Sequence, residues 1–136
     1  MPNQITRTPP LAQVRVRDCM HSGVLTCRGD DSLQDVAAIM ANYRVHAVVI
    51  LTLGADRAVG VVSDMDIVAA VAAGADCSAR EAGATETLTI SADEPLRDAA
   101  QLMSEHGVSH LVVIDGDGYP LGILSTLDVA RVFASS

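Results

Sequence analysis

The sequence predicts an α+β domain in which two similar copies pack against each other with pseudo-twofold symmetry. Residues 18–51 align without a gap with residues 81–114. One position then drops out in the second copy, and the match resumes where residues 60–66 (GVVSDMD) correspond to residues 122–128 (GILSTLD). A period of this length is too long for a solenoid repeat and too short for two independent domains. Any site formed by one copy should therefore have a twin.

The 136 residues divide into three parts on this interpretation. Residues 1–13 are polar, contain two adjacent prolines and are expected to form a flexible lead-in. Residues 14–76 form the first copy and residues 77–136 the second, with a break at the end of the first copy. Alternating apolar residues over 14–17 (VRVR) predict a short strand that opens the first copy.

Each copy is predicted to follow the order β-α-β-β-α. A short strand over residues 24–27, or 87–90 in the second copy, precedes a helix. The first helix should begin near Ser32 with Asp35 completing a capping box, and Pro95 fits the first turn of its counterpart. The apolar face of each helix, which should pack on the core, is formed by Leu33, Val36, Ala37 and Met40 and by Leu96, Ala99, Ala100 and Met103.

Two strands and a second helix complete each copy. Residues 46–51 and 109–114 are runs rich in Val, Ile and Leu, which is typical of strands buried on both faces of a sheet. Their partners are predicted over residues 58–62 and 120–124, and the DGDG sequence at 115–118 is a hairpin signal. The closing helices are predicted over residues 64–73 and 126–134.

Composition and charge exclude several classes of partner. The formal net charge is −8, lysine is absent and the arginines are scattered, so no nucleic acid partner is expected. No apolar run approaches the roughly 20 residues of a membrane-spanning helix, and residues 1–10 lack the apolar segment of a secretory signal. We therefore expect a soluble, cytoplasmic protein with no membrane association.

Candidate catalytic and metal-binding residues are few. Cys19, Cys27 and Cys77 have neither a CxxC spacing nor an evident neighbouring base, and are expected to be reduced, packed thiols. His106 and His110 have i, i+4 spacing, but a helix is predicted to give way to a strand between them, and no third ligand is apparent. The chain is therefore predicted to have no metal site and not to be an enzyme.

The most informative local pattern is Gly-h-h-Ser-x-x-Asp, where h is apolar, which occurs twice where a strand runs into a helix. It pairs Ser63 with Asp66 and Ser125 with Asp128. The free amides of a helix start can bind an anion, and an ionised carboxylate can accept two hydrogen bonds from the vicinal diol of a ribose. The spacing equally predicts a capping box, so both interpretations stay open. The apolar residues that could flank a flat base are Val61 and Ile123.

The chain resembles a free-standing tandem pair of cystathionine β-synthase (CBS) domains, a Bateman module, over nearly everything after about Val16. The resemblance rests on the paired Ser-x-x-Asp segments, on RDCM at 17–20, and on VHAVV at 45–49 and VSHLV at 108–112. It implies that clefts between the copies bind AMP, ADP, ATP, S-adenosylmethionine or NAD, with the aspartates on the ribose and the serines on ribose or phosphate. It also implies that the clefts are lined by Val24, Thr87, His46, Ala47, Ser109 and His110.

One departure from the family pattern concerns the phosphate. Similar modules often place Arg or His, or both, at the positions of His46-Ala47 and Ser109-His110, and neither pair contains Arg here. Phosphate would then be held by histidine and helix amides, which favours AMP or a less charged adenosyl compound over ATP. The alternative interpretation of His46 and His110 is a hydrogen-bonded strand histidine at the edge of the cleft.

The expected function is that of a regulatory sensor that requires no cofactor. Ligand in the cleft would bias the relative pose of the helices, which a second subunit or an effector protein reads. The resemblance also implies a flat homodimer formed through the helices. The rival interpretation is a dimerisation or protein-interaction scaffold with vestigial clefts. The missing arginine favours this rival, and the retention of both Ser-x-x-Asp pairs opposes it.

Overall fold

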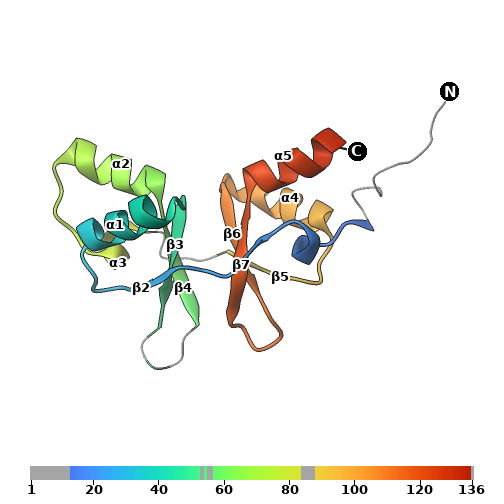
Figure 1. Ribbon diagram of the computed structural model, residues 1–136, viewed down its shortest axis with the longest axis horizontal. Coiled ribbons are helices and arrows are strands. Elements are labelled where there is room, and N and C mark those ends of the chain that lie inside the picture. The colour runs from blue at the N-terminus through green and yellow to red at the C-terminus, as the bar shows by residue number, and fades with distance from the viewer. Residues whose placement is uncertain (1–12, 53, 55–56, 84–87, 136) are drawn as a thin grey trace.

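The computed structural model describes residues 13–52, 54, 57–83 and 88–135, and Figure 1 shows two similar halves side by side. The first half contains β2 (Thr26–Arg28), α1 (Leu33–Tyr43), β3 (Ala47–Leu51), β4 (Ala58–Ser63) and α2 (Asp64–Ala73). The second half contains β5 (Thr89–Ser91), α4 (Leu96–His106), β6 (His110–Ile114), β7 (Pro120–Ser125) and α5 (Thr126–Ser135). The predicted α+β class and the order β-α-β-β-α are therefore confirmed for both copies.

The two halves share one sheet topology. In each, the first strand lies parallel to the second and the second pairs antiparallel with the third. Thr26 lies opposite Val49 and Thr89 lies opposite Val112, so the register repeats at the offset that relates the two copies in the sequence. The central residues of strands β3 and β6 are buried, as their apolar runs predict. The hairpin at 115–118 is also confirmed, because the Gly118 N–H donates to the Asp115 carbonyl oxygen over 3.1 Å.

Each half has its own buried core, and each core takes a short segment from the other copy. Val14 and Val16 pack into the second core, together with Leu96, Leu111 and Leu124. The helix α3 (Ala79–Ala82), which no pattern in the sequence predicted, packs Ala79 into the first core. The exchange is symmetrical, since isolated bridges join Arg15 to Pro95 and Ser78 to Ser32, which are equivalent positions of the two copies. The two halves are therefore connected by two exchanged segments, one at residues 14–16 and the other at α3.

The predicted strand over residues 14–17 is wrong. Residues Val16–Asp18 form a 3-10 helix, η2, because the Asp18 carboxylate accepts a hydrogen bond from the Arg15 N–H over 3.1 Å. A carboxylate three residues ahead that captures this N–H favours a helical turn over extended backbone. The alternating pattern instead reflects burial of Val14 and Val16 beside exposed arginines.

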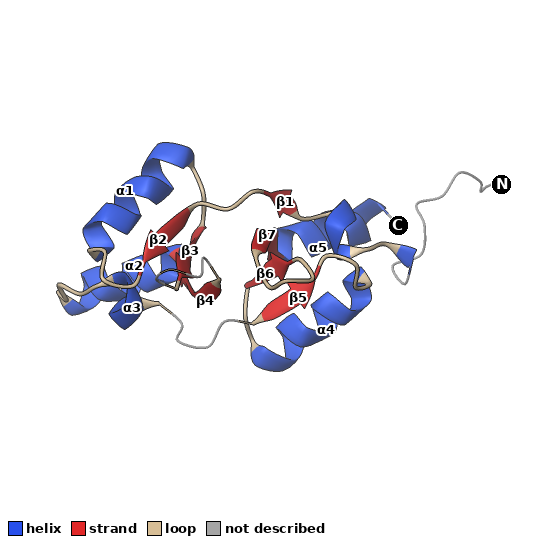
Figure 2. Ribbon diagram, turned by 90° about the horizontal axis from the view of Figure 1, so that it is seen from below, coloured by secondary structure: helices blue, strands red, loops and turns tan. Residues whose placement is uncertain are grey.

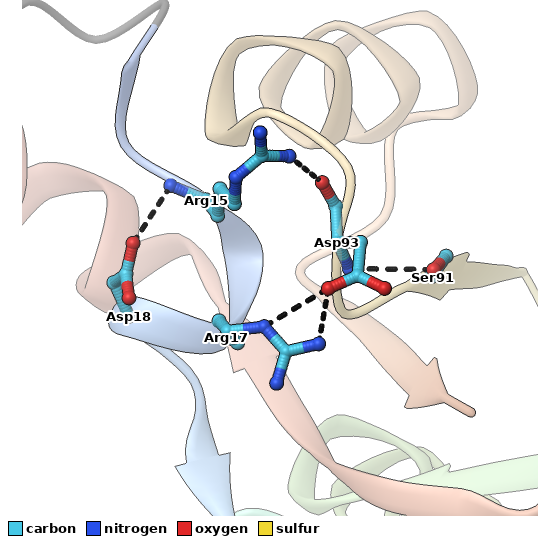
Figure 3. Close-up of polar contacts among 5 residues, drawn as sticks. All are labelled: Arg15, Arg17, Asp18, Ser91 and Asp93. Carbon is cyan, nitrogen blue, oxygen red and sulfur yellow. Dashed lines mark hydrogen bonds and ion pairs between the residues drawn. The ribbon is translucent and has the colours of Figure 1, made fainter.

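Those arginines bind the second half, as Figure 3 shows. The Arg17 guanidinium pairs with the Asp93 carboxylate, and the Arg15 guanidinium donates to the Asp93 carbonyl oxygen. The Asp93 N–H in turn donates to the Ser91 hydroxyl over 3.3 Å. Exposed pairs of this kind contribute about 0–1 kcal/mol, so burial of the two valines is the larger stabilising effect. The arginines chiefly fix where the segment lies.

This anchored segment leads into β1 (His21–Ser22), which extends the second sheet in the order β1-β7-β6-β5. His21 lies opposite Ile123, and the Gly23 N–H donates to the Leu121 carbonyl oxygen over 2.7 Å. The pairing requires glycine at 122, because a Cβ there would clash with the His21 carbonyl oxygen. A residue near the start of the first copy is thus placed beside the end of β7 in the second.

The helices α2 and α5 run along the edge of the molecule opposite the β6–β7 loop in Figure 1. Seen from below, in Figure 2, the two halves meet where their sheets face each other. In the part of the chain that the structure describes, no helix is long and apolar enough to cross a membrane.

Candidate functional site

A cavity of about 850 Å³ opens where the two halves meet, which is within the range of small-molecule sites. Its walls come from β1 and the residues after it, from the α1–β3 connection, and from the facing ends of β6, β7 and α5. The lining consists of residues 21–25, 43–47, Asp64, 109–110, Ile123, 125–127 and Arg131. Segments distant in the sequence therefore converge on one space.

The structure brings seven of the predicted site residues to this cavity, namely Val24, His46, Ala47, Ser109, His110, Ile123 and Ser125. Asp128 is not among the lining residues, but it contacts His21, which is. Val61, Ser63 and Asp66 occupy the equivalent positions of the first half and do not line this cavity. Thr87 lies outside the described residues.

Ser125 and Asp128 form a capping box at the start of α5. Asp128 Oδ2 accepts hydrogen bonds from the Ser125 N–H over 2.8 Å and from the Ser125 hydroxyl over 3.0 Å. The Asp128 N–H donates to Ser125 Oγ over 3.3 Å. One carboxylate oxygen is thus fully engaged within the motif, so an external ligand would have to use the other, Oδ1.

Ser63 and Asp66 repeat this geometry at the start of α2. Asp66 Oδ2 accepts from the Ser63 N–H over 2.8 Å and from the Ser63 hydroxyl over 3.1 Å. The capping interpretation of Ser-x-x-Asp is therefore confirmed in both copies. The two aspartates differ in burial, because Asp128 is 3% exposed whereas Asp66 is partly exposed.

Asp128, the more buried of the two aspartates, also has two additional basic partners. His21 Nε2 lies 2.9 Å from Asp128 Oδ1, and Arg131 Nη1 lies 3.9 Å from the same oxygen. The side chain of His21 is 64% exposed, so the imidazole lies on the solvent-facing side of the buried carboxylate. Asp128 therefore accepts from the capping box on one oxygen and faces two basic side chains on the other.

The histidines of the two predicted dipeptides are both hydrogen-bonded. His46 Nδ1 lies 2.9 Å from Asp64 Oδ2, a contact that lowers the pKa of the Asp64 carboxyl. Ser109 Oγ lies 3.1 Å from His110 Nδ1. Burial lowers the pKa of His110 below its ordinary value, so this imidazole is neutral at physiological pH unless an anion approaches it.

The cavity concentrates positive charge in an acidic protein. Five of its lining residues carry, or can acquire, a positive charge: His21, Arg44, His46, His110 and Arg131. Asp64 is the single acidic residue of this lining. In a chain of net charge −8, such a concentration indicates an anionic or electron-rich ligand.

Sequence reasoning missed Arg44, Arg131 and His21. A signal existed for Arg131, because a residue three positions after Asp128 lies on the same face of α5. Arg44 follows the end of α1 with a left-handed backbone, φ 57°, which turns the chain into the cavity wall. No local signal could identify His21, since its place depends on the pairing of β1 with β7.

Thiol and metal chemistry gain no support from the geometry. Burial raises the pKa of the Cys27 thiol to about 11, and it also raises the pKa of Cys19, so neither sulfur is an activated nucleophile. Within the described ranges, no three His, Cys, Asp or Glu side chains are grouped so that they could hold a metal ion. The site is thus characterised by its cavity, its cations and its capped carboxylate.

Comparison with known proteins matches this geometry to one family. The family model described as the CBS domain matches residues 16–73 and again residues 79–135. The CBS domain pair of protein MJ0100, solved in complex with 5′-methylthioadenosine and S-adenosyl-L-methionine, superposes with a TM-score of 0.82. It is 24% identical and the match covers 89% of this chain and 96% of that one, which shows the fold. The CBS domain protein PAE2072 from Pyrobaculum aerophilum, complexed with AMP, superposes with a TM-score of 0.79 at 25% identity, covering 89% and 99%.

Among curated sequences, the CBS domain-containing protein YhcV of Bacillus subtilis is 29% identical over 118 residues, covering 85% of this chain and 82% of YhcV. An L-aspartate semialdehyde sulfurtransferase of Methanosarcina acetivorans is 30% identical over 120 residues, covering 88% of this chain. The chain spans only 24% of that enzyme and about a quarter of several similar relatives. The shared part is therefore a module that also occurs within larger proteins.

Proposed function

Because this chain belongs to the CBS-domain family, as a tandem pair of CBS domains, we propose that it is a regulatory sensor that binds an adenosine-containing ligand between its two copies. The observation that carries the proposal is the basic cavity of about 850 Å³ shared by both copies. The AMP carried by PAE2072 and the two adenosyl compounds carried by the MJ0100 pair support the choice of ligand class. The proposed role is binding and signalling, without catalysis.

Each part of such a ligand finds suitable chemistry in the cavity. Val24 and Ile123 offer apolar side chains on which a base can pack. Asp128 Oδ1 is the carboxylate oxygen left to accept from a ribose diol, because Oδ2 is held by Ser125. Arg44 and Arg131 supply the guanidinium groups that the dipeptides lack, and a phosphate beside His110 would favour protonation of that imidazole.

The proposed ligands fall in an order of preference. Two arginines and a neutral histidine can compensate the charge of one phosphate, so AMP is preferred over ATP. ATP would bring additional negative charge to a protein of net charge −8. Binding would bias the relative pose of the two halves, because the cavity is lined by residues of both.

The proposal is tested by thermal unfolding of the full chain with AMP, ADP, ATP, S-adenosylmethionine and NAD, each against a ligand-free control. A ligand at 100 times its dissociation constant adds about 2.7 kcal/mol of stability. For a domain of this size that corresponds to an increase in melting temperature on the order of 10 °C. We expect the largest increase with AMP.

If none of these compounds raises the melting temperature, a scaffold with unoccupied clefts becomes the better account. That alternative has support of its own in the exposed apolar side chains Met65, Val68 and Val71 on α2 and Leu127 on α5. These helices lie along one edge of the molecule, and together they offer a surface on which a second copy can pack.

A homodimer is proposed in either case, and light scattering at micromolar concentration should give twice the mass of the chain rather than the mass of a monomer.

A further inference from the structure

We propose that His21 is a displaceable latch on Asp128, so that the cavity accepts a ribose diol only by exchanging an internal imidazole for the ligand's hydroxyl groups. The inference rests on the proposed function and deepens it. It names His21 as a residue that sets the affinity of this cavity, and the equivalent position of the second copy is Ala84.

Both oxygens of the Asp128 carboxylate are occupied by internal partners. Oδ2 is engaged by Ser125, and Oδ1 by the imidazole of His21 at 2.9 Å. Asp128 is 3% exposed and does not line the cavity, whereas His21 is 64% exposed and does. The imidazole therefore lies between the cavity and the carboxylate oxygen that a ribose would need.

The side chain of His21 can move while its backbone stays in place. The backbone is fixed by the pairing of His21 with Ile123 and by the hydrogen bond from Gly23 to Leu121. The exposed imidazole is held by its contact with a carboxylate, and rotation about χ1 can carry it to another staggered position. Displacement thus requires a change of rotamer, not the loss of a strand.

The residues of the latch are present at one aspartate and replaced at the equivalent positions of the other copy. In the alignment of the two copies, Ala84 stands where His21 stands in the first, and Ala69 stands where Arg131 stands in the second. Asp66 makes the same two contacts with Ser63, but no ion pair to it occurs among the described residues. The surroundings of the two aspartates have therefore diverged around a shared capping motif, and in the described part of the chain an imidazole pairs with Asp128 but not with Asp66.

The expected strength of the latch is modest. One hydrogen bond between an exposed imidazole and a carboxylate changes an equilibrium by about threefold to tenfold. A ligand diol that donates two hydrogen bonds can overcome such a contact. A hydroxyl-deficient ligand gains nothing from displacing the imidazole, so the latch also acts as a selector for ribose over deoxyribose.

The test is isothermal titration of the full-length wild type and His21→Ala with adenosine and with 2′-deoxyadenosine. Adenosine should bind His21→Ala about threefold to tenfold more tightly than it binds the wild type. The affinity for 2′-deoxyadenosine, which lacks the vicinal diol, should be the same in both proteins. His106→Ala serves as the matched control, because this exposed histidine lies at the end of α4, away from the cavity lining.

Folding of each variant is checked by circular dichroism. His21→Leu, which places an apolar side chain of similar size on β1, should also bind adenosine more tightly than the wild type while its affinity for 2′-deoxyadenosine is unchanged. Equal adenosine affinity in wild type and variants overturns the latch and leaves the proposed function standing. An equal gain for both nucleosides also overturns it, since His21 would then merely obstruct the cavity. If the wild type and His21→Ala both fail to bind adenosine, 2′-deoxyadenosine and AMP, the proposed function is wrong and the latch is wrong with it.

Discussion

Replacing Gly122 by alanine should lower the free energy of unfolding by about 2–3 kcal/mol and separate β1 from β7. The reason is steric, because a Cβ at this position would clash with the backbone carbonyl oxygen of His21 and approach Met20 Sδ to 3.2 Å. A backbone atom in a paired strand cannot yield as a flexible side-chain tip can. The strand must therefore move away, and its two backbone pairs with β7 are lost.

The measurement is urea unfolding of the full chain, with Gly116→Ala as the matched control. Gly116 lies in the β6–β7 hairpin, where an added Cβ would meet nothing within 4 Å, so its replacement should change stability by no more than about 0.5 kcal/mol. If Gly122→Ala is as stable as Gly116→Ala, the close approach of β1 to β7 is wrong. The position of His21 over Asp128 would be wrong as well.

Asp128→Ala should lower the free energy of unfolding by about 2–3 kcal/mol, whereas Asp66→Ala should cost about 1 kcal/mol. Both changes remove a capping carboxylate that accepts from a serine N–H and hydroxyl. Asp128 in addition is 3% exposed, so its loss leaves the Ser125 N–H and hydroxyl without a partner where water has less access than at the partly exposed Asp66. The pair is well matched because the two capping boxes have nearly the same geometry.

Chemical denaturation of the two variants alongside the wild type gives the comparison directly. The same proteins, titrated with AMP, should show a loss of binding of at least tenfold for Asp128→Ala, the equivalent of about 1.4 kcal/mol. Asp66→Ala should bind AMP in the Asp128 cleft as the wild type does. Equal destabilisation by the two changes would contradict the structural distinction between the repeats, and undiminished AMP binding by Asp128→Ala would contradict the ribose assignment.

The elements that sequence reasoning predicted well are those fixed by local patterns. The apolar runs of β3 and β6, the capping residue Ser32 and the turn at Asp115 each specify their structure through nearby residues. The predicted strand over 14–17 is wrong because its alternating pattern has a cause that is not local. Its alternation arises from packing on a distant core, and the local contact between Arg15 and Asp18 is helical.

The site was predictable only in part, because its residues converge through tertiary contacts. The repeat in the sequence implies two equivalent aspartates, and the structure shows that they differ. The difference comes from His21, which reaches Asp128 through a strand that comes from the first copy and extends the sheet of the second. Similarly, the absence of arginine from the dipeptides suggested a weak phosphate site, while Arg44 and Arg131 enter the cavity from the end of one helix and the middle of another.

A structure of the protein crystallised with saturating AMP tests the central claim most directly. The account predicts AMP in the cavity between the two copies, with its ribose hydroxyls within hydrogen-bond distance of Asp128 Oδ1 and the imidazole of His21 turned away. An empty cavity, with His21 still on Asp128 at a concentration of AMP that saturates the crystal, would contradict it.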